Sequence, residues 1–282
     1  MPLVSILSEL KKAQENNYAI PCLDTMEALG TQGIFSALEN KRSPGVIGIW
    51  SGSLDRPNAK AIVNFVIAMA EEATVPVSLI LDHGQSFELC IKALSLGFPD
   101  VMYDGSKLSL EENIANTRMV VRSAHAIGAC VEAELGQVGS GHNYQDFGAR
   151  RQGFTDPDTV EKFVAETGVD FLAIAIGSAH GVYQGDPSLD LELLAEIRKR
   201  TDIPLVLHGG SGLSDEQFHL AVAGGISKIN IFTNLALEST KRLLENAKAE
   251  NASYFSMTNQ IREAFQYETE RLIDVFGSSS KA

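Results

Sequence analysis

Short apolar runs alternate with longer amphipathic stretches along most of the chain. Most of these runs are too short for helices, and several are rich in β-branched residues, so they are predicted to be strands. The eight predicted strands span residues 18–23, 45–50, 76–81, 100–104, 130–135, 170–176, 204–208 and 228–232. Stretches with the apolar spacing of helices span residues 27–40, 57–73, 86–96, 109–127, 157–167, 189–200, 214–223 and 234–248. This eightfold alternation predicts an α/β fold of the (β/α)8, or TIM, barrel type.

Residues at the predicted helix boundaries support this assignment. Ser214 and Gln217 fit a capping box, and Asp156 precedes a proline at the first helical position. A doubly wound open sheet is the alternative. That fold should have a glycine-rich phosphate-binding turn after its first strand, and the sequence CLDTMEA at this point is not one.

Two helical segments lie outside the eight repeats. Residues 3–17 have helical apolar spacing and could plug the barrel floor. A long amphipathic helix over about 255–276 has an apolar stripe made of Met257, Ile261, Phe265, Leu272, Ile273 and Phe276. Packing on its own barrel would explain the stripe, but so apolar a helix beyond a complete barrel could instead cover a neighbouring subunit. We expect a homo-oligomer, either a homodimer or a homotetramer, and a single domain over residues 1–282.

Length and charge narrow the class of protein. The chain has 282 residues, which suits one barrel of about 250 residues with additions. Its net charge of −13 argues against a nucleic-acid partner. The apolar runs are far shorter than the roughly 18 residues of a membrane span, and the first residues lack the pattern of a signal peptide. Three cysteines match no metal or redox motif. We therefore expect a cytoplasmic protein without membrane or nucleic-acid partners.

Polar residues gather where the predicted strands end, which is where TIM barrels place their chemistry. His83, His180 and His208 lie at or just past the ends of three different strands. Three converging imidazoles favour a divalent metal, above all Zn²⁺ with an open coordination position. The other polar residues at strand ends are Asp24, Ser51, Asp82, Asp104, Glu132, Glu134, Asn230 and Thr233.

Glycine-rich and polar turns after the last two strands predict an anion site. The sequence HGGSG at 208–212 leads into a capped helix, and NIFTN at 230–234 leaves the eighth strand. Glycines let backbone N–H groups approach an anion closely, and the loops after strands 7 and 8 often bind phosphate in this fold. The long polar loop within 132–154 is a candidate lid, in which Arg150 and Arg151 could meet an anionic substrate.

The motifs LDHG, DVMYDGS, EAELGQVG, GSAHGVY, LHGGSG and KINIFT occur in this order along the chain. Together they resemble the class II, metal-dependent ketose-phosphate aldolases, the family of fructose- and tagatose-bisphosphate aldolases. The resemblance covers nearly the whole chain. It implies a (β/α)8 barrel, a homo-oligomer, one catalytic Zn²⁺ per subunit and a monovalent cation near the substrate phosphate.

The same resemblance assigns roles to individual residues. It implies that His83, His180 and His208 ligate zinc and that Asp82 is the catalytic proton donor. Asp104 and Glu134 match acidic positions of an alternate or second metal site. The positions that match the binding site for the dihydroxyacetone-phosphate half are Gly181, Gly209, Gly210, Ser211, Asn230, Ile231, Phe232 and Thr233.

Departures from the family pattern cluster on the part of the site that would face the aldehyde half. Asp24 and Glu27 stand where amides are usual, and the loop after the fifth strand lacks the usual glutamate. An acidic pair would repel a second phosphate unless Arg150 or Arg151 compensates. The residues predicted to determine aldehyde specificity are Asp24, Glu27, Ser51, Asp146, Arg150 and Arg151.

These observations predict an enzyme of carbohydrate metabolism, a carbon–carbon lyase. It would reversibly cleave a ketose 1-phosphate (or 1,6-bisphosphate), other than fructose bisphosphate itself, to dihydroxyacetone phosphate and an aldehyde. A non-catalytic subunit that binds sugar phosphates is one alternative, because the loop glutamate is missing. A metal hydrolase on the same barrel is another, because three histidines and a carboxylate can activate water.

Overall fold

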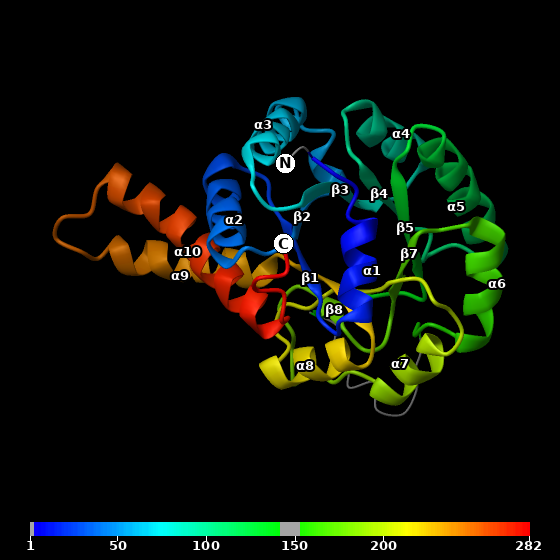
Figure 1. The fold of residues 1–282 in the computed structure, drawn as a ribbon. Helices are drawn as coiled ribbons and strands as arrows, with labels where there is room; N and C mark the ends of the chain where they lie inside the picture. The colour runs from blue at the N-terminus through cyan, green and yellow to red at the C-terminus, as the bar shows by residue number, and fades with distance from the viewer. Residues whose placement is uncertain (1–2, 142–152) are drawn as a thin grey trace.

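Eight parallel strands close into a barrel in the computed structural model, which describes residues 3–141 and 153–282 (Figure 1). Around the barrel the strands follow the order β1, β10, β9, β7, β5, β4, β3, β2. Their bounds are β1 Ile20–Asp24, β2 Gly45–Trp50, β3 Val77–Gly84, β4 Asp100–Tyr103, β5 Cys130–Leu135, β7 Phe171–Ile174, β9 Leu205–Leu207 and β10 Ile226–Ile231. The predicted barrel is therefore confirmed. A short parallel pair, β6 (Gly139–Ser140) and β8 (Ala179–His180), lies outside it.

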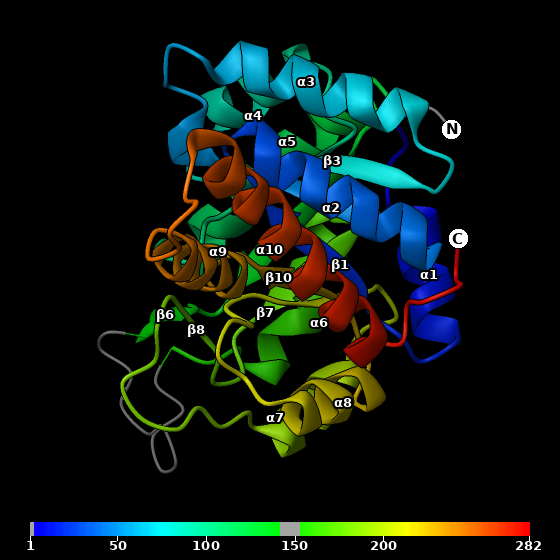
Figure 2. The ribbon, with the colours of Figure 1, turned by 90° about the vertical axis from the view of Figure 1, so that its left-hand side faces the viewer.

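Helices surround the barrel on its outside (Figures 1 and 2). They are α2 Ala28–Lys41, α3 Ala59–Glu72, α4 Phe87–Ser95, α5 Leu110–His125, α6 Pro157–Thr167, α7 Leu191–Arg198, α8 Asp215–Ala223 and α9 Thr233–Asn246. Ser214 and Gln217 form the predicted capping box, and Asp156 caps α6 with Pro157 in its first turn. The eight predicted helices are present, with ends within about two residues of those predicted, as is usual for helix boundaries.

The N-terminal helix α1 (Leu7–Glu15) fills the floor of the barrel, as the sequence suggested. Ile6, Leu10 and Ala13 are fully buried. They form one apolar cluster with Ile20, Cys22, Val46, Ile80, Met102, Phe171, Ala173 and Val206. Asp100 at the start of β4 ties this segment down, because its carboxylate accepts bonds from Ser5 Oγ (2.6 Å) and the Ile6 amide (2.9 Å). Helix α1 and its apolar cluster therefore close this end of the barrel. The polar strand-end residues lie at the other end.

The long C-terminal helix α10 (Tyr254–Val275) packs against α2 and α9 (Figure 2). Gly33 permits this close approach, since a Cβ there would lie 2.3 Å from the Arg262 carbonyl oxygen. The inner part of the predicted stripe is buried on the chain's own helices, at Phe265, Leu272 and Ile273. The α9–α10 hairpin projects from the barrel (Figure 1), and Tyr254 near its tip is 76% exposed. Intramolecular packing therefore accounts for much of the stripe, and the homo-oligomer stays a prediction.

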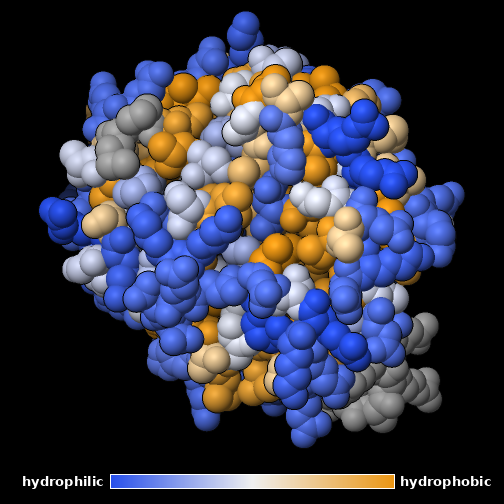
Figure 3. Space-filling model, turned by 45° about the vertical axis from the view of Figure 1, so that its right-hand side comes forward, coloured by the Kyte–Doolittle hydropathy of each residue, from blue (hydrophilic) through white to orange (hydrophobic). Residues whose placement is uncertain are grey.

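One face of the molecule is mainly polar. Hydrophilic residues predominate on the face seen in Figure 3, and the hydrophobic areas between them are discontinuous. Within residues 3–141 and 153–282, no helix combines the length and apolar character that crossing a membrane requires.

Candidate active site

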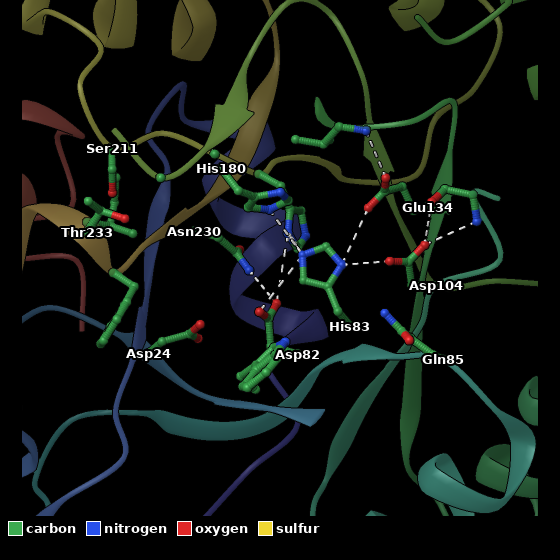
Figure 4. Close-up of a pocket in the computed structure, with 18 of the residues that line it drawn as sticks. Asp24, Asp82, His83, Gln85, Asp104, Glu134, His180, Ser211, Asn230 and Thr233 are labelled. Atoms are coloured by element: carbon green, nitrogen blue, oxygen red, sulfur yellow. Dashed lines mark hydrogen bonds and ion pairs between the residues drawn. The ribbon is translucent and has the colours of Figure 1, made fainter. Parts of the chain in front are cut away.

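A pocket of about 510 Å³ opens at the C-terminal ends of the barrel strands. Each of the eight barrel strands, or the segment just after it, contributes at least one polar or aromatic side chain to its wall. These residues include Asp24, Trp50, His83, Asp104, Glu134, His180, His208 and Asn230. The predicted ring of carboxylates and imidazoles is therefore one continuous site (Figure 4).

The end of β3 has an unusual backbone that directs two side chains into this pocket. Its pairing with β4 is interrupted between Leu81 and Gly84, and such irregularities re-aim side chains. His83 has a φ of 52°, in the left-handed region that a histidine seldom adopts. Its Nδ1 lies 2.9 Å from Asp104 Oδ2, and Asp104 in turn accepts a bond from Ser106 Oγ (2.6 Å). This anchored ring presents its Nε2 atom to the pocket.

Three histidines converge on one point. His83 Nε2 lies 3.1 Å from His180 Nε2 and 3.1 Å from His208 Nδ1. Nitrogens bound tetrahedrally to one Zn²⁺ at about 2.05 Å would be roughly 3.3 Å apart. The donor set, three imidazoles with an open side toward the pocket, is also one that zinc prefers in catalytic sites. The residues present therefore fit a zinc ion.

The charges around the three histidines affect one another. Burial opposes protonation of His83, but Asp82, Asp104 and Glu134 raise its pKa to about 10. Burial and the positive charges of the other two histidines lower the pKa of His180 to about 3. Without a metal, the carboxylates thus favour a proton on His83, and a bound cation would take the place of that proton because histidine binds a metal through an unprotonated nitrogen.

Asp104 and Glu134, which the family resemblance assigned to an alternate or second metal site, lie close to His83. Ligand atoms of these three residues lie within 4.8 Å of one another. Glu134 Oε1 accepts a bond from the Val138 amide (3.1 Å), whereas its buried Oε2 has no hydrogen-bond partner. Burial and the charge of Asp104 raise the pKa of Glu134 to about 8. Its carboxyl group is therefore set up either to hold a proton or to meet a cation.

Asp82 lies beside the histidines with 6% of its surface exposed. Asn230 Nδ2 donates to its Oδ1 atom (2.9 Å), and its Oδ2 atom lies 3.9 Å from His83 Nε2. Burial would raise the pKa of Asp82, but the charges of His83, His208 and the nearby Lys228 lower it. Asn230 thus fixes one carboxylate oxygen, and the other lies beside the histidine cluster.

The predicted phosphate residues line one side of the pocket, except Gly210, which is not in its wall. Gly209 has a φ of 68°, and a Cβ there would lie 2.5 Å from the Ala179 carbonyl oxygen. Tyr183 connects the segment after β7 to the loop after β9. Its hydroxyl accepts from the Ala179 amide (2.7 Å) and donates to the Gly209 carbonyl (2.8 Å). Helix α9 begins at Thr233 beside them, and its N-terminus favours an anion.

The predicted aldehyde-side residues have separate locations. Asp24 lines the pocket, and its buried Oδ1 lacks a hydrogen-bond partner. Burial and the charge of Asp82 raise the pKa of Asp24 well above its usual value. Glu27 is instead the N-cap of α2, accepting from the amides of Leu29 (2.6 Å) and Gly30 (2.5 Å).

This placement weakens the predicted repulsion of a second phosphate. Asp24 holds a proton more readily than a surface aspartate, and Glu27 is occupied by the helix cap. Ser51 is buried in the short helical turn after β2 and is not in the pocket wall. Asp146, Arg150 and Arg151 lie outside the described residues.

Sequence reasoning assigned no role to Lys228 or Glu132 in the barrel interior. Both side chains are fully buried, and Lys228 Nζ lies 2.8 Å from Glu132 Oε2. The available sign was a lysine in the otherwise uncharged strand sequence ISKINI, because a buried lysine requires a partner. Other pocket residues that the sequence did not single out include Thr25, Met26, Gln85, Ser106, Lys107, Gln137 and Val138.

Comparisons with known proteins agree on one family. The model of the family described as "Fructose-bisphosphate aldolase class-II" matches residues 4–281. The chain is 39% identical to the "Probable fructose-bisphosphate aldolase" of Bacillus subtilis (strain 168), and the match covers 100% of both chains. It is also 39% identical to the "Fructose-bisphosphate aldolase" of Geobacillus stearothermophilus, over 100% of this chain and 99% of the relative. The crystal structure of the YdjI aldolase from Escherichia coli K12 superposes with a TM-score of 0.89, at 34% identity and 99% coverage of both chains.

Proposed function

Because this chain belongs to the class II fructose-bisphosphate aldolase family, we propose that it is a zinc-dependent aldolase. It would reversibly cleave a ketose 1-phosphate to dihydroxyacetone phosphate and an aldehyde. The observation that carries this proposal is the convergence of His83, His180 and His208 beside Asp82. Three barrel segments far apart in the sequence supply these residues.

The histidines would hold the zinc ion, with its open position toward the pocket. When bound, zinc would supply Lewis-acid stabilisation of the negative charge that develops on the substrate's carbonyl oxygen during cleavage. Asp104 would fix the orientation of the His83 ring through the 2.9 Å contact with Nδ1. Glu132 would do the same for His208, whose Nε2 lies 2.6 Å from Glu132 Oε1.

Asp82 would move the proton that cleavage requires. Its lowered pKa keeps it ionised, so its Oδ2 atom, which lies near the histidines, could accept the proton of the hydroxyl group next to the bond that breaks. In the condensation direction the same carboxyl group would return that proton to the new hydroxyl. Asn230 would hold Asp82 in place through the bond to Oδ1.

The loops after β9 and β10 would bind the substrate phosphate. Gly209 and Ser211 provide a closely approachable backbone and a hydroxyl, and the α9 N-terminus at Thr233 provides a favourable dipole. The phosphate would hold the reacting carbons near the histidines, so that part of the barrier is overcome by positioning.

The aldehyde half would contact the remaining wall of the pocket. Trp50, which is 46% exposed, and Met26 supply apolar surface there. Apart from the histidines, Lys107 is the only cationic side chain in the wall formed by residues 3–141 and 153–282. We propose that the substrate is a ketose 1-phosphate other than fructose bisphosphate, because Trp50 and Met26 give the described part of this wall an apolar surface.

A substrate panel tests the proposal. Zinc-loaded protein is mixed with ketose 1-phosphates and bisphosphates that differ in chain length and end group, and release of dihydroxyacetone phosphate is measured. Wild-type protein should release it from at least one ketose 1-phosphate, and an Asp82→Asn variant should be at least about 100-fold slower. The protein is a binding subunit instead if it binds dihydroxyacetone phosphate but cleaves no ketose phosphate. In that case it should also fail to catalyse exchange of the carbon-bound hydrogen of dihydroxyacetone phosphate with heavy water.

A further inference from the structure

A buried chain of hydrogen bonds runs through the barrel interior beneath the histidine cluster. Lys228 of β10 and Glu132 of β5 are both 0% exposed, and Lys228 Nζ lies 2.8 Å from Glu132 Oε2. Lys228 Nζ also lies 2.7 Å from Asn230 Oδ1. Burying a charge is costly unless it is paired and hydrogen-bonded, so a lysine at this depth needs both contacts.

One branch of this chain ends on a metal-site histidine. Glu132 Oε1 lies 2.6 Å from His208 Nε2, while its Oε2 accepts from Lys228. A carboxylate acceptor at Nε2 fixes that nitrogen as the protonated one and leaves Nδ1 unprotonated toward the cluster. Glu132 is itself held by Lys228, so the lysine acts on His208 through one intervening residue.

The other branch ends on the proton-transferring carboxylate. A lysine ammonium group can only donate, so its contact requires that Asn230 present its carbonyl oxygen to Lys228. The amide NH₂ of Asn230 then faces Asp82 and donates to Oδ1 at 2.9 Å. Without the lysine, the bond to Asp82 alone would hold the amide in this orientation, so Lys228 supplies the second of two contacts that fix it.

We propose that Lys228 is a positioning residue that aligns two parts of the active site at once, namely His208 through Glu132 and Asp82 through Asn230. This inference rests on the proposed function, because it assigns zinc binding to His208 and proton transfer to Asp82. A lysine that merely neutralised Glu132 would stabilise the fold without influencing Asp82.

Three variants separate these possibilities. Lys228→Met removes the charge and both hydrogen bonds. The double variant Glu132→Gln/Lys228→Met removes the whole ion pair, so no unpaired charge stays buried and folding is favoured. Lys92→Met is the matched control, because Lys92 also bonds a carbonyl oxygen and a carboxylate, those of Leu54 and Asp55, on the surface.

Two measurements are made on each variant. Zinc affinity, from competition with a chromophoric chelator, reports on His208 and needs no catalysis. The ratio of ketose-phosphate cleavage to hydrogen exchange of dihydroxyacetone phosphate in heavy water reports on Asp82. Lys228→Met and the double variant should bind zinc at least about tenfold more weakly, and cleavage should fall about tenfold more than exchange. Lys92→Met should match wild type in both.

The proposal is overturned if the double variant keeps wild-type zinc affinity and a wild-type cleavage-to-exchange ratio. It is also overturned if only one of the two measurements changes, because a shared role requires both. Glu132 contacts His208 directly, so zinc binding by the double variant does not isolate the effect of Lys228. If Lys228→Met does not fold, the cleavage-to-exchange ratio of the double variant decides, and an unchanged ratio overturns the proposal. Absence of aldolase activity in the wild type would refute the proposed function, whereas the zinc measurement would still test the link from Lys228 to His208.

Discussion

Replacing Asp104 tests how the protein orients a metal-binding histidine. His83 has a left-handed backbone, so its ring direction depends on side-chain contacts, chiefly the 2.9 Å contact between Nδ1 and Asp104 Oδ2. Burial would raise the pKa of Asp104, but its bonds with His83 and Ser106 lower that pKa well below its usual value. The carboxylate is therefore ionised, and the contact is a charge-assisted hydrogen bond.

The expected loss of zinc affinity follows from this contact. Asp104→Asn keeps an oxygen that can accept the bond but removes the charge, which costs about 1.4 kcal/mol, the difference between a charge-assisted and a neutral hydrogen bond. That corresponds to roughly tenfold weaker zinc binding. Asp104→Ala removes the acceptor altogether and should weaken binding up to about 100-fold, the upper range for partners of metal-binding histidines.

Competition with a chromophoric chelator measures both affinities. Asp170→Asn is the control, because Asp170 Oδ2 likewise lies 2.8 Å from a histidine nitrogen, Nε2 of the partly exposed His125, away from the pocket. It should leave zinc affinity unchanged. Zinc affinity of Asp104→Ala within twofold of wild type would refute the idea that this contact orients His83.

Two further predictions concern the phosphate loops and the barrel floor. Tyr183→Phe loses two hydrogen bonds between the loops, so KM for the phosphorylated substrate should rise about tenfold with kcat little changed; steady-state kinetics showing an unchanged KM would contradict this role. Burial raises the pKa of Asp100 to about 6 from 3.8, so its contribution to stability is complete below pH 3.8 and is lost as pH rises through 6. The free energies of unfolding in urea should therefore shift by about 3 kcal/mol in favour of Asp100→Asn, relative to wild type, between pH 3 and 7. A difference that stays constant with pH would argue against a raised pKa of Asp100.

The alternation of apolar runs was enough to predict the barrel because each strand and helix has its own local pattern. The strand-end rule of TIM barrels then located His83, His180 and His208 correctly at one mouth, although 125 positions separate the first from the last. This worked because a closed parallel barrel brings all strand ends of one kind together.

Other features depended on contacts that local sequence does not reveal. Glu27 was interpreted as a substrate-facing acid, but its backbone is extended, and its carboxylate caps α2. Whether Asp24 would carry a negative charge depended on its burial and on the charge of nearby Asp82, which both raise its pKa. Lys228 could be noticed in its strand, but its partner Glu132 lies 96 positions away, on a strand three places further round the barrel.

Titration of metal-free protein with zinc tests the central claim most directly. The protein is stripped of metal, zinc is added in steps, and release of dihydroxyacetone phosphate from the best substrate is recorded beside bound zinc. The three-histidine site predicts that activity is absent at the start and rises in proportion to bound zinc, to a maximum at one zinc per chain. Full activity in the stripped protein, or a His208→Ala variant that follows the same titration as wild type, would contradict it.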